Sequence, residues 1–278
     1  MGICFDKIRQ GNCTLFINRD FRNDDLEQAL SAGEKSLQEH YKLTPVLSSR
    51  TSRVYKFSTS FNGTERLIYF KQYLFRSNWD FIKHLVRSSR ARRAFKASLI
   101  LEKNGFETPV IIAVGERKNS FLDRENFLVT LEVEGAKQIY QFIPDKTDDL
   151  TKEQLKAKRR LLRDFGQTVG RMHAVGIFHG DLRLGNILAK EENHGWHFFL
   201  IDNERTRKFR RLPSRLRLKN LVQVNMLNSD GITKTDRTRF FKAYLKENPL
   251  ITYKRKRWVE RIIAKTDRRF EKKERSFV

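Results

Sequence analysis

One ordered set of polar residues limits what this chain can fold into more than any other feature. His179, Asp181 and Asn186 stand in the pattern His-x-Asp-x-x-x-x-Asn, and Asp202 directly follows the apolar run 198–201. A loop that carries Asp181 and Asn186 can turn both into one cleft while its leucine and isoleucine side chains anchor it in the core. The apolar run has the length of a buried strand, so a strand, a turn and a second strand would return Asp202 to Asn186.

These residue types are the ones that phosphoryl transfer requires. A carboxylate orients and deprotonates the acceptor hydroxyl, while an amide oxygen and a second carboxylate hold Mg²⁺ against the phosphates of ATP. We therefore predict that Asp181 is the catalytic residue and that Asn186 and Asp202 bind the metal. An Asp or an Asn alone is common in surface loops, so the prediction depends on the complete set in its order.

With this motif the chain resembles the lipopolysaccharide core kinases, the Kdo/WaaP family of the protein-kinase-like superfamily. Stretches at 89–95, 105–109 and 233–241 support this branch of the superfamily. The resemblance implies a two-lobed α+β fold, with a small antiparallel-sheet N-lobe over 1–133 and a mainly helical C-lobe over 134–278. It also implies that His179 braces the catalytic loop, and that the acceptor is a hydroxyl of an inner-core sugar of lipopolysaccharide, a heptose or Kdo.

The N-terminal half has the pattern of a small sheet. Strands are expected at 53–61 and 65–73, because Asn62-Gly63 between them tolerates the positive φ angles of a tight hairpin. Lys71 lies on the second strand, and the resemblance makes it the lysine that grips the α- and β-phosphates of ATP. The resemblance further places adenine at a hinge, where the Leu131 C=O and the Val133 N–H would hydrogen-bond it.

Two departures from the family pattern concern the nucleotide side. The segment 47–54 has no glycine, so its serine and threonine hydroxyls, with Arg50 or Arg53, would replace a Gly-rich phosphate loop. The helix expected at 88–104 has Ala94 where the fold places a glutamate that orients the lysine. Glu102 is the only acid in that helix, and it is the possible partner of Lys71.

The sequence pattern of the C-terminal half predicts a mainly helical structure. A capping box at 151–154 opens a long helix that ends near His173, which we expect to be a cap or surface residue. Further helices are expected after Arg215 and at 235–245, and Trp258 is expected to pack in the core. The sequence contains no Ala-Pro-Glu and no activation segment of protein-kinase type, which argues against a kinase of peptide substrates.

The charge of the chain points to an anionic partner. Lys and Arg number 57 against 33 Asp and Glu, a formal net charge of +24. An anionic membrane surface, a phosphorylated glycolipid or nucleic acid would explain this excess, whereas a neutral small molecule would not. Together with the resemblance, the positive charge favours the glycolipid and the membrane over nucleic acid as partners. The alternative is a basic surface that serves only solubility. The basic stretches are 76–96, 156–163, 205–219 and 254–275.

Composition adds the expected compartment. Two cysteines, no long apolar run and no secretory pattern at the start suit a cytosolic protein. We expect an ATP- and Mg²⁺-dependent kinase on the cytoplasmic face of the inner membrane of a Gram-negative bacterium. Two other classes stay open: a kinase of another small alcohol or of a protein, and a nucleotide-binding pseudokinase. The sequence sets neither the oligomeric state nor whether the first 40 residues fold on their own.

Overall fold

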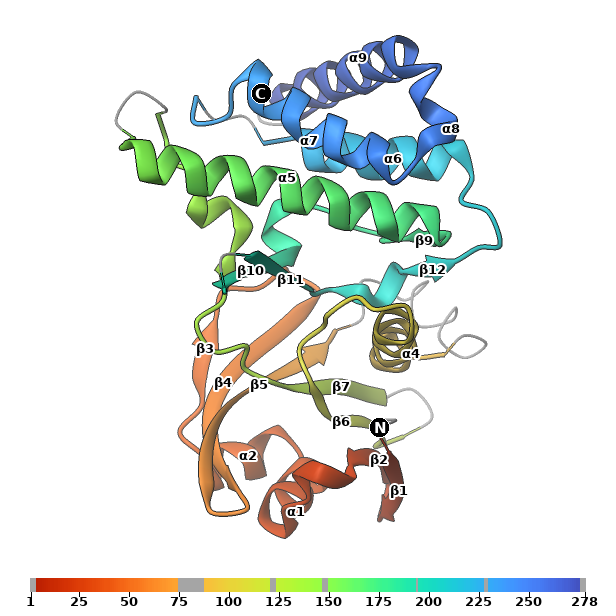
Figure 1. The fold of residues 1–278 in the computed structure, drawn as a ribbon. Coiled ribbons are helices and arrows are strands. Elements are labelled where there is room, and N and C mark those ends of the chain that lie inside the picture. Colours follow the sequence, from red (N-terminus) through yellow and green to blue (C-terminus); the bar gives the residue numbers. More distant parts are fainter. Residues whose placement is uncertain are drawn as a thin grey trace. The chain divides into compact units, whose positions relative to one another are not determined.

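The structure, a computed structural model, describes residues 4–74, 88–120, 124–146, 150–193, 195–227 and 230–275. The chain forms two compact units. The N-terminal unit consists of Met1–Lys96 and Pro109–Glu134, and the C-terminal unit of Ala97–Thr108 and Gly135–Val278. Helix α4 (Arg90–Lys103) gives its first half to one unit and its second half to the other (Figure 1).

A seven-stranded antiparallel sheet in the order β1-β2-β6-β7-β5-β4-β3 forms the N-terminal unit. The predicted hairpin is present: β4 and β5 pair along their length, and Asn62 and Gly63 turn between them with φ angles of 51° and 75°. This sheet beside a helical unit confirms the predicted α+β class. The strands are β1 (Phe5–Gln10), β2 (Cys13–Asn18), β3 (Thr44–Val46), β4 (Ser52–Phe61), β5 (Thr64–Tyr73), β6 (Ile111–Lys118) and β7 (Arg124–Leu131).

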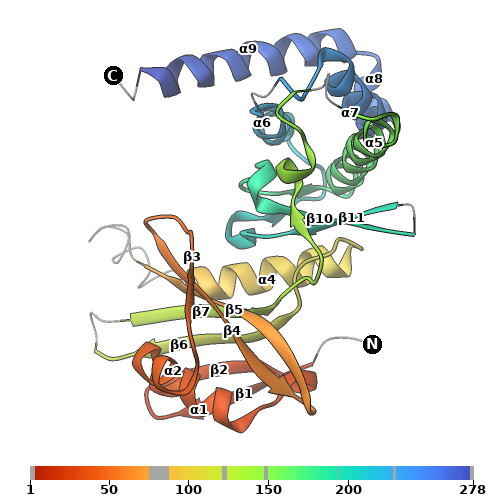
Figure 2. The same ribbon diagram turned by 90° about the vertical axis from the view of Figure 1, so that its left-hand side faces the viewer.

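The first 40 residues belong to this sheet and its core. Strand β2 pairs with β6, and helices α1 (Asp24–Ala32) and α2 (Glu34–His40) lie beside the sheet (Figure 2). Leu26, Leu30 and Leu37 are fully buried in the same cluster as side chains from the central strands. Full burial of one such side chain contributes roughly 1.5–3 kcal/mol, so the N-terminal segment stabilises the sheet rather than forming a separate domain.

The C-terminal unit is mainly helical, and its helices begin close to the predicted positions. The helices are α5 (Lys152–Ala174), α6 (Ser214–Asn225), α7 (Lys234–Lys246), α8 (Pro249–Thr252) and α9 (Arg255–Glu274). The short strands are β8 (Lys137–Gln138), β9 (Ile177–Phe178), β10 (Ile187–Glu192), β11 (Gly195–Leu200) and β12 (Arg207–Lys208). Within the described ranges, no helix has the length and apolar character needed to cross a membrane.

Helices α5 and α7 pack closely because α5 carries glycines at the contact. A Cβ atom at Gly166 would lie 2.4 Å from the Phe240 carbonyl oxygen, so only glycine allows this approach. A buried ion pair joins the same two helices, with Lys158 Nζ 2.9 Å from Asp236 Oδ2. Asp236 also completes a capping box with Thr233 at the start of α7. Residues 233–241 therefore cap the start of α7 and hold this helix against α5.

The prediction for His173 was wrong. This residue is 1 % exposed, because α5 runs on to Ala174 and the histidine faces the core beside Met172. The hydroxyl of Tyr244 lies 3.0 Å from its Nδ1, and the amide oxygen of Asn220 lies 3.1 Å from its Nε2. Burial lowers the pKa of His173 to about 3, so the ring is neutral at physiological pH.

Candidate active site

The residues of the His-x-Asp-x-x-x-x-Asn motif lie in the loop between β9 and β10. Asn186 ends this loop, and Ile187 of β10 pairs with Leu200 of β11. Beyond that pair, the Ile201 N–H donates a hydrogen bond to the Asn186 carbonyl oxygen over 3.0 Å. Asp202 is the next residue, so the strand–turn–strand unit brings it back to Asn186.

Asp202 has an unusual backbone conformation. Its φ of 59° and ψ of 42° lie in the left-handed region, which residues other than glycine adopt infrequently and which Asp tolerates better than most. Residues held in such conformations cluster at functional sites, where the surrounding structure enforces the geometry. The conformation also ends β11 abruptly and starts the short helical turn Asn203–Arg205.

His179 is fully buried and connects the two segments that carry the acids. Its Nε2 donates to the Asn203 side-chain oxygen (3.0 Å) and lies 3.2 Å from the Ile201 carbonyl oxygen. Its Nδ1 accepts the Asp181 N–H over 3.2 Å. Burial lowers the pKa of His179, and these partners require the neutral ring with its hydrogen on Nε2. The ring is therefore placed to fix the loop rather than to meet a substrate.

Two side chains hold the carboxylate of Asp181. Its Oδ1 accepts a hydrogen bond from Gln223 Nε2 over 3.1 Å and forms an ion pair with Arg183, whose Nε lies 2.9 Å away. The Arg183 side chain is 72 % exposed, and such a pair is worth at most about 1 kcal/mol. Gln223 is buried, so it is the partner that can fix the position of the carboxylate.

Helix α6 braces the catalytic loop through two buried amides. Asn220 accepts the His179 N–H over 3.2 Å and donates to the His179 carbonyl oxygen and to Gln223 Oε1. Gln223 Oε1 also accepts the Leu182 N–H over 3.3 Å. The sequence analysis predicted this helix from its leucines and valines, and it gave neither amide a role. Two amides three residues apart share one helical face, and this spacing was the available signal.

Glycine at position 180 is required by close packing. A Cβ atom there would lie 2.0 Å from the Cβ of Arg205 and 2.7 Å from its carbonyl oxygen. The segment after Asp202 therefore presses directly on the backbone between His179 and Asp181. Any larger residue would push these two segments apart.

The side-chain oxygens of Asn186 and Asp202 are suited to bind Mg²⁺. Asn186 donates its NH₂ group to the Asp181 carbonyl oxygen (2.9 Å), which leaves the amide oxygen as its ligand atom. This oxygen and the Asp202 carboxylate are hard donors of the kind Mg²⁺ prefers, and Mg²⁺ takes its other ligands from phosphates and water. Among the residues that the structure describes, no group of three or more His, Cys, Asp or Glu side chains could hold a metal.

The predicted phosphate-binding residues lie in the N-terminal unit. Lys71 stands in the middle of the sheet, with Val54 of β4 on one side and Leu128 of β7 on the other. The turn that precedes β4 is tied by its own hydroxyls: Ser49 Oγ lies 3.0 Å from Thr51 Oγ1 and 3.1 Å from Ser52 Oγ. These hydroxyls therefore stiffen a turn that has no glycine.

Of the two residues predicted to bind adenine, Leu131 ends β7 and Val133 lies two residues beyond it. The Leu131 N–H donates to the Val110 carbonyl oxygen over 2.8 Å. In the described part of the chain, no group accepts a hydrogen bond from the Val133 N–H, which is the donor predicted for adenine. Glu102 lies in the C-terminal unit and accepts a hydrogen bond from the Thr108 hydroxyl over 2.8 Å; burial raises its pKa. Its pairing with Lys71 stays a prediction.

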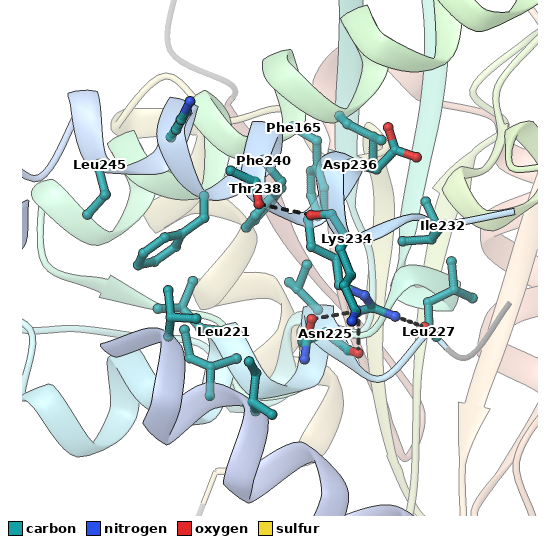
Figure 3. Close-up of a pocket in the computed structure, with 18 of the residues that line it drawn as sticks. Phe165, Leu221, Asn225, Leu227, Ile232, Lys234, Asp236, Thr238, Phe240 and Leu245 are labelled. Atoms are coloured by element: carbon teal, nitrogen blue, oxygen red, sulfur yellow. Dashed lines mark hydrogen bonds between the residues drawn. The ribbon is translucent and has the colours of Figure 1, made fainter. Parts of the chain in front are cut away.

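An apolar cavity of about 860 Å³ lies in the C-terminal unit between α5, α6, α7 and α9 (Figure 3). Leu221 of α6 and Leu184 of the catalytic loop belong to its wall, whereas the acids and amides of the site do not. Helix α6 therefore has two roles: one face holds the catalytic loop through Asn220 and Gln223, and another lines the cavity.

Comparisons with known proteins agree with this geometry. No curated protein sequence matched the chain. The structure is similar to a solved structure described as WaaP in complex with acyl carrier protein, with a TM-score of 0.58 and 20% identity. The match covers 88% of this chain and 97% of that chain. The two proteins thus share a fold.

Family membership follows from the sequence as a whole. The sequence model of the lipopolysaccharide kinase (Kdo/WaaP) family matches residues 7–244, and the chain belongs to this family. It is therefore a phosphotransferase that acts on a sugar hydroxyl in the lipopolysaccharide core. The predicted family, fold class and enzyme class are confirmed.

Proposed function

We propose that this kinase transfers the γ-phosphoryl group of ATP to a hydroxyl of a heptose or Kdo in the inner core of lipopolysaccharide. The observation that carries the proposal is the position of Asp181. Its carboxylate is held by the buried Gln223 next to Asn186 and Asp202, which are suited to Mg²⁺. A base, two metal ligands and a fixed loop are the parts that phosphoryl transfer to an alcohol needs.

The chemical step follows from the two oxygens of Asp181. Oδ1 is occupied by the hydrogen bond it accepts from Gln223 and by the ion pair with Arg183, so Oδ2 receives the proton of the acceptor hydroxyl. The hydroxyl oxygen forms the new bond to the γ-phosphorus as the bond to ADP breaks. Asn186 and Asp202 would hold Mg²⁺, which neutralises charge on the phosphates when it is bound. His179 keeps the loop in place and takes no proton.

Three of the residues assigned to the nucleotide lie in the N-terminal unit. Lys71 holds the α- and β-phosphates, and the Leu131 C=O and the Val133 N–H hydrogen-bond adenine. Glu102 of the C-terminal unit is the partner of Lys71. Support for these roles comes from the place of Lys71 on β5 and from the Val133 N–H just beyond β7, which no described group accepts.

The enzyme works on the cytoplasmic face of the inner membrane. The support is the net charge of +24 together with a glycolipid acceptor. Each Lys or Arg near an anionic leaflet contributes about 1 kcal/mol of attraction, so a handful suffices for reversible binding.

Mass spectrometry of the acceptor tests this proposal. Purified lipopolysaccharides that end in Kdo or in inner-core heptose are incubated with ATP, Mg²⁺ and the enzyme, and the sugars are then sequenced. We expect one added phosphate on an inner-core sugar, and no phosphate when EDTA removes the metal. Phosphate on a dialysable alcohol or on a protein, with none on the glycolipid, would refute the assigned acceptor.

A further inference from the structure

Helix α9 follows directly after α8 in the C-terminal unit (Figure 1). We call residues 250–257 the α8–α9 corner. Leu250 is 78 % exposed and Tyr253 is 93 % exposed, whereas Ile251 between them is buried and anchors the turn in the core. These two large side chains, three residues apart, offer apolar surface to a partner next to the cations that follow them.

Four consecutive cations complete the corner. Lys254, Arg255, Lys256 and Arg257 are all exposed, and none forms an ion pair with any residue in the described ranges. On α5, by comparison, Arg160 pairs with Glu191 at 2.7 Å and Lys158 pairs with Asp236, whereas the exposed Lys156 and Arg159 pair with no described acid. The positive charge of the corner is therefore not balanced by the protein itself.

Trp258, next to these cations, is not part of the exposed surface. It is 7 % exposed and packs in the main core of the C-terminal unit, as predicted. Together with Ile251 it fixes the corner from beneath. The aromatic ring that this surface offers to a partner is Tyr253, which the sequence reading did not single out.

We propose that the α8–α9 corner docks the enzyme on an anionic membrane surface. Leu250 and Tyr253 enter the interface, where an amphipathic ring is favoured, while residues 254–257 contact anionic headgroups. Each such cation strengthens binding roughly five-fold, and membrane attachment is stable only when apolar and electrostatic contributions act together. The inference rests on the proposed membrane site of action, but the binding itself needs neither ATP nor acceptor.

Vesicle sedimentation tests the role of charge. Binding to vesicles of phosphatidylcholine with phosphatidylglycerol is compared for the wild type and a variant with all four cations 254–257 changed to Gln. A matched variant changes Arg268, Arg269, Lys272 and Arg275 to Gln, which removes equal charge from the end of α9 and the residue after it. The described residues of this stretch include no exposed large apolar side chain.

We expect the corner variant to bind about 600-fold more weakly than the wild type, because four cations each contribute roughly five-fold. The matched variant should lose much less, because its cations do not lie at the proposed membrane contact. Equal losses in the two variants would reduce the effect to net charge and overturn the proposal. Undiminished binding of the corner variant, or equal binding of the wild type to phosphatidylcholine alone, would also overturn it.

A fluorescent label tests insertion. In a Cys4→Ser background, Leu250→Cys is labelled with a polarity-sensitive dye; the other cysteine, Cys13, is buried. Leu47→Cys is the control, since Leu47 is also fully exposed but lies in the N-terminal unit. A blue shift with anionic vesicles is expected at position 250 alone. A shift at both positions, or at neither, contradicts insertion of the corner.

Activity on lipopolysaccharide dispersed in detergent separates this inference from the proposed function. The corner variants should phosphorylate the dispersed acceptor at the wild-type rate. A loss of that activity would show a catalytic or structural defect and count against a docking role. Vesicle binding by the corner without any phosphorylation of lipopolysaccharide would support the docking surface and refute the proposed function.

Discussion

The two halves of the catalytic machinery are held in different ways. In the C-terminal unit, two buried amides of α6 hold the loop: Gln223 bonds the Asp181 carboxylate and Asn220 bonds the backbone of His179. In the N-terminal unit, Lys71 has its place from backbone pairing with β4 and β7, and the serine turn before β4 is tied by its own hydroxyls. The difference teaches that buried side chains preorganise the groups proposed for chemistry, whereas strand pairing and a short turn place those proposed for the nucleotide.

The largest expected effect concerns the residues of the C-terminal unit that we propose to bind the metal. Asp202→Asn keeps a residue that tolerates the left-handed backbone but removes the negative charge from the metal site. We expect turnover to fall about 1,000-fold, since metal-ion catalysis supplies several kcal/mol. Turnover is measured by release of ADP, and circular dichroism checks the fold. Wild-type turnover would show that Asp202 does not bind the metal.

Gln223 tests whether α6 positions the base. Gln223→Glu retains the oxygen that accepts the Leu182 N–H but replaces the group that donates to Asp181 with a second acid. We expect kcat to fall about 100-fold with little change in KM for ATP, because a small misplacement of a catalytic group costs about that much. The loss of kcat in Gln223→Glu should become smaller as the pH is lowered, because a protonated carboxyl group at position 223 can again donate a hydrogen bond to Asp181.

Gln223→Met is the matched variant, because it has a similar shape and removes all of these hydrogen bonds. If Gln223 only braces the loop backbone, the Met variant loses activity and the Glu variant keeps it. If it positions Asp181, both variants lose kcat. A fully active Glu variant would therefore contradict the contrast between the two halves.

The sequence predicted the local parts of this molecule and missed the long-range ones. The β4–β5 hairpin and the capping box of α5 follow from short-range patterns, and the structure has both. The return of Asp202 to Asn186 was predictable because a short turn links two adjacent strands. The contacts of α6 were not, because a buried amide such as Asn220 looks like a surface residue until its partners from distant segments are known. The same reason explains the wrong prediction for His173.

The pH dependence of the free energy of unfolding tests how the C-terminal unit holds His173. His173 is neutral in the folded protein, with its pKa lowered to about 3, whereas in the unfolded chain it has the ordinary value of 6.5. Its contribution is complete above 6.5 and is lost as the pH falls toward the folded value, because the unfolded chain then binds the extra proton. At about pH 5 we expect a loss of about 2 kcal/mol in the free energy of unfolding.

Urea unfolding at neutral pH and at about pH 5 measures this loss. His173→Gln removes the titrating group while it retains atoms that can hydrogen-bond Tyr244 and Asn220. Its stability should therefore depend less on pH than that of the wild type, by about 2 kcal/mol. Identical pH dependence in the two proteins would show that His173 is protonated in the folded state.

The smallest expected effect belongs to the nucleotide side. If Glu102 orients Lys71, Glu102→Gln should raise KM for ATP about ten-fold, which corresponds to about 1.4 kcal/mol. Thr108→Val is the control, because it removes the hydrogen bond that Glu102 accepts in the C-terminal unit and leaves the Glu102 carboxyl in place. Equal effects of the two variants on thermal stability, with KM unchanged in both, would assign Glu102 to that bond alone.

The most direct test is the transfer of labelled γ-phosphate from ATP to purified deep-rough lipopolysaccharide by the wild type and by Asp181→Ala. The variant should bind ATP normally, because its nucleotide residues lie in the N-terminal unit, and should transfer phosphate at least about 1,000-fold more slowly, as expected when a general base is removed. Transfer at the wild-type rate by Asp181→Ala would contradict the assignment of the base. No label in the glycolipid with the wild type would contradict the proposed acceptor.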